Sequence, residues 1–322
     1  MSSIEHRDVS LERRGRLCRV VSEDANEEGW QDVEESGSAV GIHALVVAAT
    51  MFGRPAVRVI VAFVAFYYAL FSRRSRASVV AFRRRLSLPD GFLASYRHIL
   101  RFSQCTLDAL FFMRGRTDLF EVTQTGHHHL EELRSSGSGA ILLGAHLGSF
   151  YAMRAASADE RLALNPIVYT KNARKFNAVI ESLDPTSTTR LIEIGEGGQV
   201  AFMLKIRDRV DDGALVAILG DRVQPEGRSV SVDFLGGKAK LPLGPYLLAA
   251  SLRRPVYFTV GVYRGGNRYD LHCIPFAKRI VLPRGRREEA MAEYAQQYAD
   301  VLADFCQKYP DNWFNFYDFF EE

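Results

Sequence analysis

The sequence lacks the cysteine patterns of disulfide-bonded and zinc-binding proteins. Its four cysteines are far apart in a chain of 322 residues and form no C-x-x-C pair. A disulfide framework and a zinc site are therefore not expected, and the cysteines are interpreted as reduced thiols in a protein that faces the cytosol. They are Cys18, Cys105, Cys273 and Cys306.

Clusters of metal-binding side chains are equally scarce. The consecutive histidines His127, His128 and His129 precede an expected helical stretch, residues 130–134, and no second group of ligands stands nearby in the sequence. Metal binding is the alternative for this cluster, but we interpret it as a group of surface histidines. We expect no metal and no other cofactor.

The chain also has no large excess of charge of one sign. Its formal net charge is +3 at pH 7 and 47% of its residues are hydrophobic, so it can bury a full core and is not a polycation. Basic residues nevertheless cluster twice, and no nucleic-acid reader motif or aromatic platform accompanies them. We expect no nucleic-acid partner; the first cluster follows the most hydrophobic part of the chain and suits anionic headgroups. The clusters are Arg73, Arg74, Arg76, Arg83, Arg84 and Arg85, and Lys278, Arg279, Arg284, Arg286 and Arg287.

No uninterrupted apolar run reaches the roughly 20 residues that span a bilayer as a helix. Residues 1–38 are polar and charged and lack the apolar core of a signal peptide, so we expect a disordered charged tail. The composition changes at residue 39, where two apolar stretches of about 13 to 15 residues begin, separated by Arg54, Pro55 and Arg58.

These two stretches predict a hydrophobic membrane-attachment segment over residues 39–76. Either one tilted helix spans the bilayer, or both stretches lie in the interface as a kinked hairpin. A buried pair of core helices is the alternative that involves no membrane. Tyr67, Tyr68 and the arginines that follow favour attachment, because they are typical of an interfacial belt with positive charge on the cytoplasmic side.

Residues 77–322 have the pattern of one α/β domain. A helical region, residues 78–113, is interrupted at 89–91, and apolar strand-like stretches then alternate with helical ones. Gly265, Gly266 and Asn267 separate two strand-like stretches and predict a hairpin. The order predicts a mixed, mostly parallel sheet flanked by helices. The expected strands are 140–143, 165–169, 191–194, 214–219, 256–263 and 268–274, and the expected helices are 151–158, 173–183, 199–209, 243–251 and 287–308.

Polar side chains follow three of these expected strands. Because the carboxyl ends of parallel strands meet at one edge of a sheet, we expect the three groups to converge in one cleft, as an active site on an open sheet requires. The groups are His146, then Tyr169 with Lys171 and Asn172, and finally Asp221 with Arg222.

His146 is the candidate general base of this cleft. The unperturbed pKa of histidine is near 6.5, so the side chain can accept a proton from a hydroxyl at neutral pH. Such a base needs an orienting partner, and five residues later the chain has Tyr151 instead of a carboxylate. Asp221 is then the candidate partner. The alternatives are a core histidine with satisfied hydrogen bonds and an Asp221 that only caps a turn beside Arg222.

Four blocks of sequence, in this order, resemble the late lipid A acyltransferases of the glycerolipid acyltransferase superfamily. The likeness runs from about residue 40 to residue 320 and includes the hydrophobic N-terminal segment. No single block is decisive, but four in the right order are specific. The blocks are GAHLGSFYAMR, VYTKNARKFNAVIESL, AILGDRVQPEGRSVSVDFLGGKAKLPLGPYLLAASLRRPV and YPDNWFNFYDFF.

The resemblance implies roles for individual residues. In that family the histidine of an H-x4-D/E motif deprotonates the acceptor hydroxyl, which attacks an acyl thioester, and the acidic residue orients the histidine. His146 matches the histidine, whereas Tyr151 stands at the acidic position, so Asp221 is expected to supply the acid. Substrate-binding positions implied by the resemblance are Tyr151, Tyr169, Lys171, Asn172, Arg222 and Gly244.

Two of these assignments depart from the family pattern or have a plain alternative. Thr170 and Lys171 stand where the family has an arginine–proline pair. Gly244 lies in a Pro-Leu-Gly-Pro stretch that resembles the family's helix-starting turn near the acyl groove, and a simple proline-initiated helix cap is the alternative.

The sequence thus predicts a membrane-attached O-acyltransferase, placed at the bacterial inner membrane with its catalytic domain on the cytoplasmic face. The expected donor is an acyl-carrier-protein or coenzyme A thioester, and the expected acceptor is a hydroxyl of lipid A, another glycolipid or a lipid-like pigment precursor. Membrane lipids and the donor are the expected partners, and Arg253, Arg254, Lys278 and Arg279 are candidates for donor docking. The alternative is a catalytically inactive homologue that binds acyl chains or holds an acyltransferase complex at the membrane, for which Tyr151 is the main support.

Overall fold

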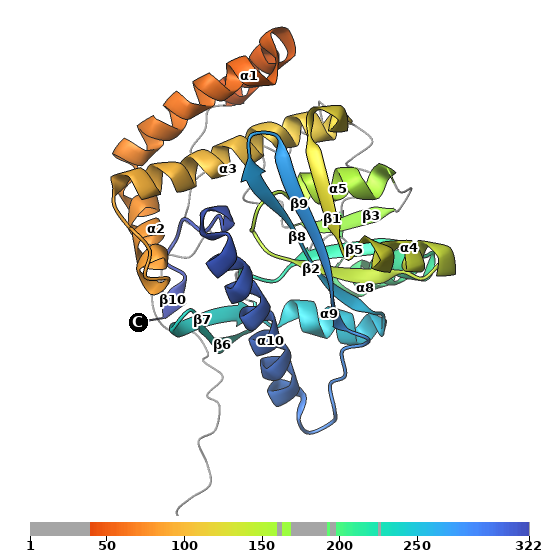
Figure 1. Ribbon diagram of the computed structural model, residues 1–322. Helices are drawn as coiled ribbons and strands as arrows, with labels where there is room; N and C mark the ends of the chain where they lie inside the picture. Colours follow the sequence, from red (N-terminus) through yellow and green to blue (C-terminus); the bar gives the residue numbers. More distant parts are fainter. Residues whose placement is uncertain (1–38, 160–162, 169–191, 194–197, 225–226, 322) are drawn as a thin grey trace, which may run out of the picture.

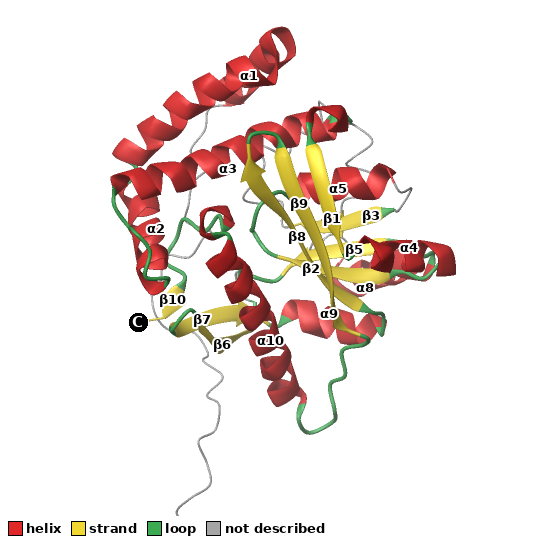
Figure 2. Ribbon diagram, in the orientation of Figure 1, coloured by secondary structure: helices red, strands yellow, loops and turns green. Residues whose placement is uncertain are grey.

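A seven-stranded sheet forms the centre of the part of the chain that the structure describes (Figures 1 and 2). The structure, a computed structural model, describes residues 39–159, 163–168, 192–193, 198–224 and 227–321. The strand order is β1-β9-β8-β2-β5-β3-β4, and every neighbouring pair is parallel except β8 with β9. The predicted mixed, mostly parallel sheet is confirmed. Its strands are β1 (Glu121–Thr125), β2 (Ala140–Gly144), β3 (Leu164–Val168), β4 (Ile192–Glu193), β5 (Leu215–Leu219), β8 (Val256–Gly265) and β9 (Arg268–Ala277).

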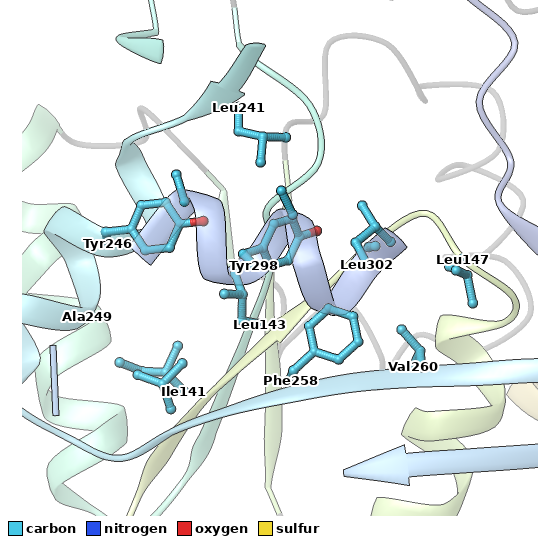
Figure 3. Close-up of a cluster of buried hydrophobic side chains, with 14 of the residues drawn as sticks. Ile141, Leu143, Leu147, Leu241, Tyr246, Ala249, Phe258, Val260, Tyr298 and Leu302 are labelled. Atoms are coloured by element: carbon cyan, nitrogen blue, oxygen red, sulfur yellow. The ribbon is translucent and has the colours of Figure 1, made fainter. Parts of the chain in front are cut away.

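The central strand β2 is buried on both faces, as its continuous apolar sequence predicts. Successive side chains of a strand point to opposite faces, so Ile141 and Leu143 pack with the cluster under α9 and α10, while Ala140 and Leu142 pack with α4 on the other face. Figure 3 shows the first of these clusters, with Tyr246 and Tyr298 beside the side chains from β2. The helices named here are α4 (His127–Ser136), α9 (Gly244–Leu252) and α10 (Arg287–Lys308).

Several elements confirm the expectations from sequence closely. β8 and β9 form the predicted antiparallel hairpin, and α10 covers the predicted residues 287–308. Two further helices, α5 (Phe150–Asp159) and α8 (Gly198–Asp211), differ from the expected bounds by one or two residues. The expected helix 173–183 and the expected tail 1–38 lie outside the described residues.

Two features differ from the sequence-based expectation. His127, His128 and His129 do not precede their helix but form the first turn of α4. β1 was not expected at all, because every residue of Glu121–Thr125 is exposed and the segment has no apolar alternation. Backbone pairing with β9 at the edge of the sheet is what holds β1 in place.

A second, three-stranded antiparallel sheet packs beside α10, with the order β10-β7-β6. Val232, Phe234, Ala239 and Leu241 carry its apolar side chains into the same core as β2 and α10. This sheet was not predicted either. Its strands are β6 (Ser229–Phe234), β7 (Gly237–Pro242) and β10 (Phe320–Glu321).

Three helices precede the sheet, and the first holds the predicted hydrophobic segment. α1 is kinked at Gly53, whose φ is 72° and ψ 173°, so the helix axis changes direction there. Beyond the kink α1 packs along α3 (Figure 1). Within the described residues, Met51–Phe71 is the one helical segment that is long and apolar enough to cross a membrane. The bounds are α1 (Ala39–Phe71), α2 (Arg73–Arg85) and α3 (Phe92–Met113), which match the predicted break at 89–91.

Candidate active site

Strand register brings His146 and Asp221 together although they are 75 residues apart in sequence. β2 and β5 are parallel neighbours, and Gly144 at the end of β2 pairs with Leu219 at the end of β5. His146 lies two residues after the end of β2, and Asp221 lies two residues after the end of β5. The two backbone segments therefore leave the sheet side by side. The amide of Gly220 donates to the carbonyl oxygen of Gly144 at 2.9 Å, and this hydrogen bond keeps the two segments in register beyond the strand ends.

The Asp221 carboxylate holds His146 at two points. Nδ1 of His146 lies 2.8 Å from Oδ1 of Asp221, and the backbone amide of His146 donates to Oδ2 at 2.9 Å. The Asp221 side chain is 2% exposed, whereas that of His146 is 30% exposed. The carboxylate is therefore enclosed by the protein, and the imidazole is the member of the pair that solvent or substrate can reach.

Ionisation of Asp221 determines which nitrogen of His146 carries the proton. Burial alone disfavours the carboxylate, but the charge and hydrogen bonds of His146 prevail and lower the pKa of Asp221 to about 2. An ionised carboxylate has no proton to donate, so Nδ1 must be the donor in the contact with Asp221. The lone pair of a neutral His146 then lies on Nε2, where a general base needs it.

Arg222 places a positive charge beside this pair. Its guanidinium Nη2 donates to the backbone oxygen of Phe314 at 3.0 Å, and its centre lies 5.8 Å from the ring centroid of Tyr317. Burial, followed by the charge of Arg222, lowers the pKa of His146, while Asp221 acts in the opposite direction. The net shift favours the neutral imidazole, the form that can accept a proton.

The side chain that contacts His146 is Asp221 and not the residue at position 151. Tyr151 is the second residue of α5, and its half-buried ring packs against the apolar cluster that includes Phe314. Burial raises the pKa of the Tyr151 hydroxyl, so it stays protonated. The carboxylate that contacts His146 comes from the end of β5, and not from the helix that follows the histidine.

Four predicted substrate-binding positions remain, three after β3 and one at the start of α9. Tyr169, Lys171 and Asn172 lie outside the described residues, because β3 is described only to Val168. Gly244 is the exposed first residue of α9, so its substrate-binding role stays a prediction.

The basic residues considered for donor docking lie at the other end of the sheet. Arg253 and Arg254 precede β8, and Lys278 and Arg279 follow β9, whose Ala277 pairs with Val256. Val256 pairs with Ile141 near the start of β2, whereas His146 follows its end. One of the four, Arg254, is also paired with Asp211 at 2.7 Å.

A segment after α10 encloses the pair, and analysis of the sequence did not identify it as part of the site. Trp313 donates its indole N–H to Oδ2 of Asp221 at 3.3 Å, and the amide of Phe314 donates to the backbone oxygen of His146 at 2.8 Å. His98 on α3 contacts the backbone oxygen of Trp313 through Nε2 at 2.9 Å. We call residues 309–317 the C-terminal strap.

The strap also fixes the loop that carries His146. Asn312 accepts the amide of Gly148 on its backbone oxygen at 2.8 Å, while its side chain accepts from the amide of Tyr263 at 2.8 Å. Gly148 has a φ of 71°, and a Cβ there would lie 2.0 Å from the backbone oxygen of Gly261. Only glycine permits this close approach of the loop to β8. The one sequence signal for the strap was its run of asparagine and aromatic residues outside any helical pattern.

An apolar cavity of about 90 Å³ lies beside the loop of His146. Strands β2, β3 and β5 and the first turns of α5 line it, and its walls include Gly144, Leu147, Phe150 and Ile167. Among the described residues, no three His, Cys, Asp or Glu side chains are grouped so that they could hold a metal ion.

The part of the chain that holds this site matches one known protein family. The family of bacterial lipid A biosynthesis acyltransferases matches residues 108–321, about two thirds of the chain, and both His146 and Asp221 lie within the match. The chain belongs to this family. No curated protein matches it significantly. Family membership supports an acyltransferase that acts on a lipid-like acceptor, and it confirms the resemblance seen in the four sequence blocks.

Proposed function

We propose that the protein is a membrane-attached O-acyltransferase in which His146 is the general base and Asp221 orients it. The observation that carries the proposal is the 2.8 Å contact between Nδ1 of His146 and the buried, ionised carboxylate of Asp221. This contact leaves Nε2 free to accept a proton and holds the imidazole in one orientation.

The reaction follows from that arrangement. Nε2 of His146 takes the proton of the acceptor hydroxyl as its oxygen attacks the thioester carbonyl carbon. Collapse of the tetrahedral intermediate breaks the C–S bond, and the imidazolium returns the proton to the departing thiolate. Asp221 stabilises the imidazolium between these steps, so one ester and one thiol form and the pair is regenerated.

The donor is an acyl-carrier-protein or coenzyme A thioester, and the acceptor is a lipid-linked hydroxyl of lipid A, another glycolipid or a lipid-like pigment precursor. The small apolar cavity beside the loop of His146, about 90 Å³, suits a short aliphatic portion of a substrate and not a whole acyl chain. We place the protein at the bacterial inner membrane with its catalytic domain on the cytoplasmic face, where both donors are made. The exposed apolar face of α1 and the arginines in the first turn of α2, Arg73 and Arg74, support attachment to that membrane.

The alternative of an inactive acyl-binding homologue depended on the absence of an acid at position 151. Asp221 makes the contact that this acid would have made, so the geometry favours the enzyme.

A transfer assay tests the proposal. Membranes containing the full chain are offered labelled acyl-carrier-protein and acyl-coenzyme A thioesters with lipid acceptors, and His146→Ala is the matched variant. We expect transfer by the native chain and a loss of about 10²- to 10⁴-fold in His146→Ala, the usual contribution of a general base. Unchanged transfer in a folded His146→Ala protein contradicts the mechanism, and acyl binding without transfer by the native chain favours the inactive homologue.

A further inference from the structure

The outward face of α1 carries the largest group of exposed apolar side chains in the described chain. Beyond the kink, helical geometry places Val59, Phe63, Tyr67 and Leu70 on one side of α1, and their exposed fractions run from 48% to 72%. A soluble monomer rarely leaves so continuous an apolar surface in water. The surface continues onto the start of α3, where Leu93 is 67% exposed and Phe92 packs edge-on against Phe66.

The opposite face of α1 is fixed to the protein along its length. Val57, Val61, Ala65 and Ala69 recur every four residues and are at most 4% exposed. The first two belong to the apolar cluster that α3 builds with Phe314, and the last two pack in the cluster with Ile99 and Phe316. α3 is itself anchored, because ten of its residues are buried in the domain.

Both charged residues of Met51–Phe71 also face the protein. Arg54 makes two hydrogen bonds, of 2.6 and 2.7 Å, to the carboxylate of Asp108, which is fully buried and also accepts the hydroxyl of Tyr269. Arg58 donates to the backbone oxygen of Gly266 at 2.6 Å. The outward face is left without charge, and detaching α1 would leave Asp108 buried without its cation.

A helix attached in this way cannot cross a bilayer without taking its partner along. The part before the kink, Ala39 to Phe52, is about 21 Å long, which is shorter than the hydrocarbon core of roughly 30 Å. The part after the kink is joined along its side to α3, which carries Arg97, Arg101 and the buried Asp108.

We infer that α1 lies parallel to the membrane surface, with its apolar outward face in one leaflet, and does not span the bilayer. The inference deepens the proposed function and depends on its membrane attachment. The first turn of α2, directly after α1, carries Arg73 and Arg74, and positive charge at this place suits the anionic headgroups beside an interfacial helix. The C-terminal strap connects the two sites: Phe314 and Phe316 pack in the clusters behind α1, and Trp313 contacts Asp221. The active site is thereby held next to the leaflet from which it takes its acceptor.

Spin labels along the outward face measure this orientation. Ala56, Phe63 and Leu70 are exposed, share one face and span 14 residues, or about 21 Å along the axis. Each is changed to cysteine in the full chain with Cys18→Ser, because Cys105, Cys273 and Cys306 are buried. The labelled proteins are reconstituted into vesicles of phosphatidylethanolamine and phosphatidylglycerol. Depth is read from the relative accessibility to oxygen and to a water-soluble nickel complex, with Val200→Cys on α8 as the control, since Val200 is 75% exposed.

We expect the three α1 labels to lie at one shallow depth, shielded from nickel, while the Val200→Cys label stays accessible to it. Depths that change steadily from residue 56 to residue 70 by 10 Å or more, on the scale of about 21 Å along the axis, identify a spanning helix and overturn the inference, although membrane attachment itself stands. Vesicle binding with all three labels open to nickel overturns it as well, because another surface then holds the membrane. A native chain that does not bind vesicles removes the attachment and the inference together.

Discussion

The indole N–H of Trp313 and the carboxylate of Asp221 are hydrogen-bonded at 3.3 Å inside the protein. Oδ2 of Asp221 thus accepts from Trp313 and from the amide of His146, while Oδ1 faces Nδ1 of His146. Both Trp313 and Asp221 are almost fully buried, so no water replaces these donors. The carboxylate cannot rotate without breaking one of the three contacts.

Trp313→Phe tests whether this hydrogen bond positions the pair. The phenylalanine ring keeps the packing against Phe82, Phe234 and Phe319 but cannot donate. We expect kcat to fall about tenfold with little change in KM, in line with about 1.5 kcal/mol for a hydrogen bond to a charged group. Steady-state transfer kinetics measure both parameters. Phe82→Leu is the packing control, and an equal loss of kcat in that variant would show that Trp313 acts through packing alone.

Asp221→Asn tests the orienting role directly. An amide at this position can donate to Nδ1 of His146 and so favours the tautomer whose Nε2 carries the proton and cannot act as a base. We expect transfer to fall by three to four orders of magnitude, on the order of the 10⁴-fold loss known for a catalytic triad. The double variant with His146→Ala should be scarcely slower than His146→Ala alone, because members of one catalytic unit are not additive. Additive losses would mean that Asp221 and His146 act separately.

The pH dependence of transfer follows from the pKa of His146. A general base acts in its neutral form, so the rate rises as pH climbs through this pKa and is level above it. Burial and the charge of Arg222 place the pKa below its ordinary value of 6.5, so we expect the acid limb of kcat/KM below pH 6.5 and a plateau at pH 7. Asp221 adds no limb in this range, because its pKa is about 2.

Arg222→Gln moves that limb in a direction that geometry fixes. Removing the positive charge favours the imidazolium, so the midpoint should shift to higher pH, whatever happens to the maximal rate. A midpoint that stays in place or moves to lower pH would show that Arg222 does not act on His146 electrostatically.

The parts of the site that follow from local sequence patterns can be predicted, whereas contacts between residues far apart in the sequence cannot. The apolar run 140–143 and the run 214–219 show two buried strands, and polar residues at their ends predict that His146 and Asp221 meet. The hairpin at Gly265 and Gly266 and the helix α10 follow from equally local patterns. β1 has no such pattern, since only backbone pairing with β9 defines it.

The strap shows why the rest could not be predicted. Trp313 and Asn312 reach His146, Asp221 and Tyr263 through single hydrogen bonds across long stretches of sequence, and nothing in the spacing of these residues indicates such partners. β6 and β7 are a different case. SVSVDF alternates polar and apolar residues before a turn at Leu235 and Gly236, and this local alternation is itself typical of a strand in a hairpin.

Tyr151→Glu asks whether an acid at the family position improves the enzyme. His146 already has its carboxylate, and position 151 is half-buried among apolar side chains. We expect no gain in transfer and a loss of stability of about 1 to 3 kcal/mol for burying a polar group without a partner. Thermal unfolding and transfer kinetics measure the two effects, with Tyr151→Phe as the isosteric control. A clear rise in kcat would show that Asp221 orients His146 incompletely.

Phe63→Glu tests membrane attachment against a matched change elsewhere. Phe63 on α1 and Val200 on α8 are exposed to similar extents, 72% and 75%, so neither substitution disturbs the core. If the outward face of α1 lies in a leaflet, Phe63→Glu loses the burial of a phenylalanine, about 1.5 to 3 kcal/mol, and places a charge in the interface as well. We expect its partition onto anionic vesicles to fall at least about tenfold in a sedimentation assay, whereas Val200→Glu should bind like the native chain. Equal binding by the two variants would mean that α1 does not contact the membrane, and equal loss would mean that added negative charge alone accounts for the effect.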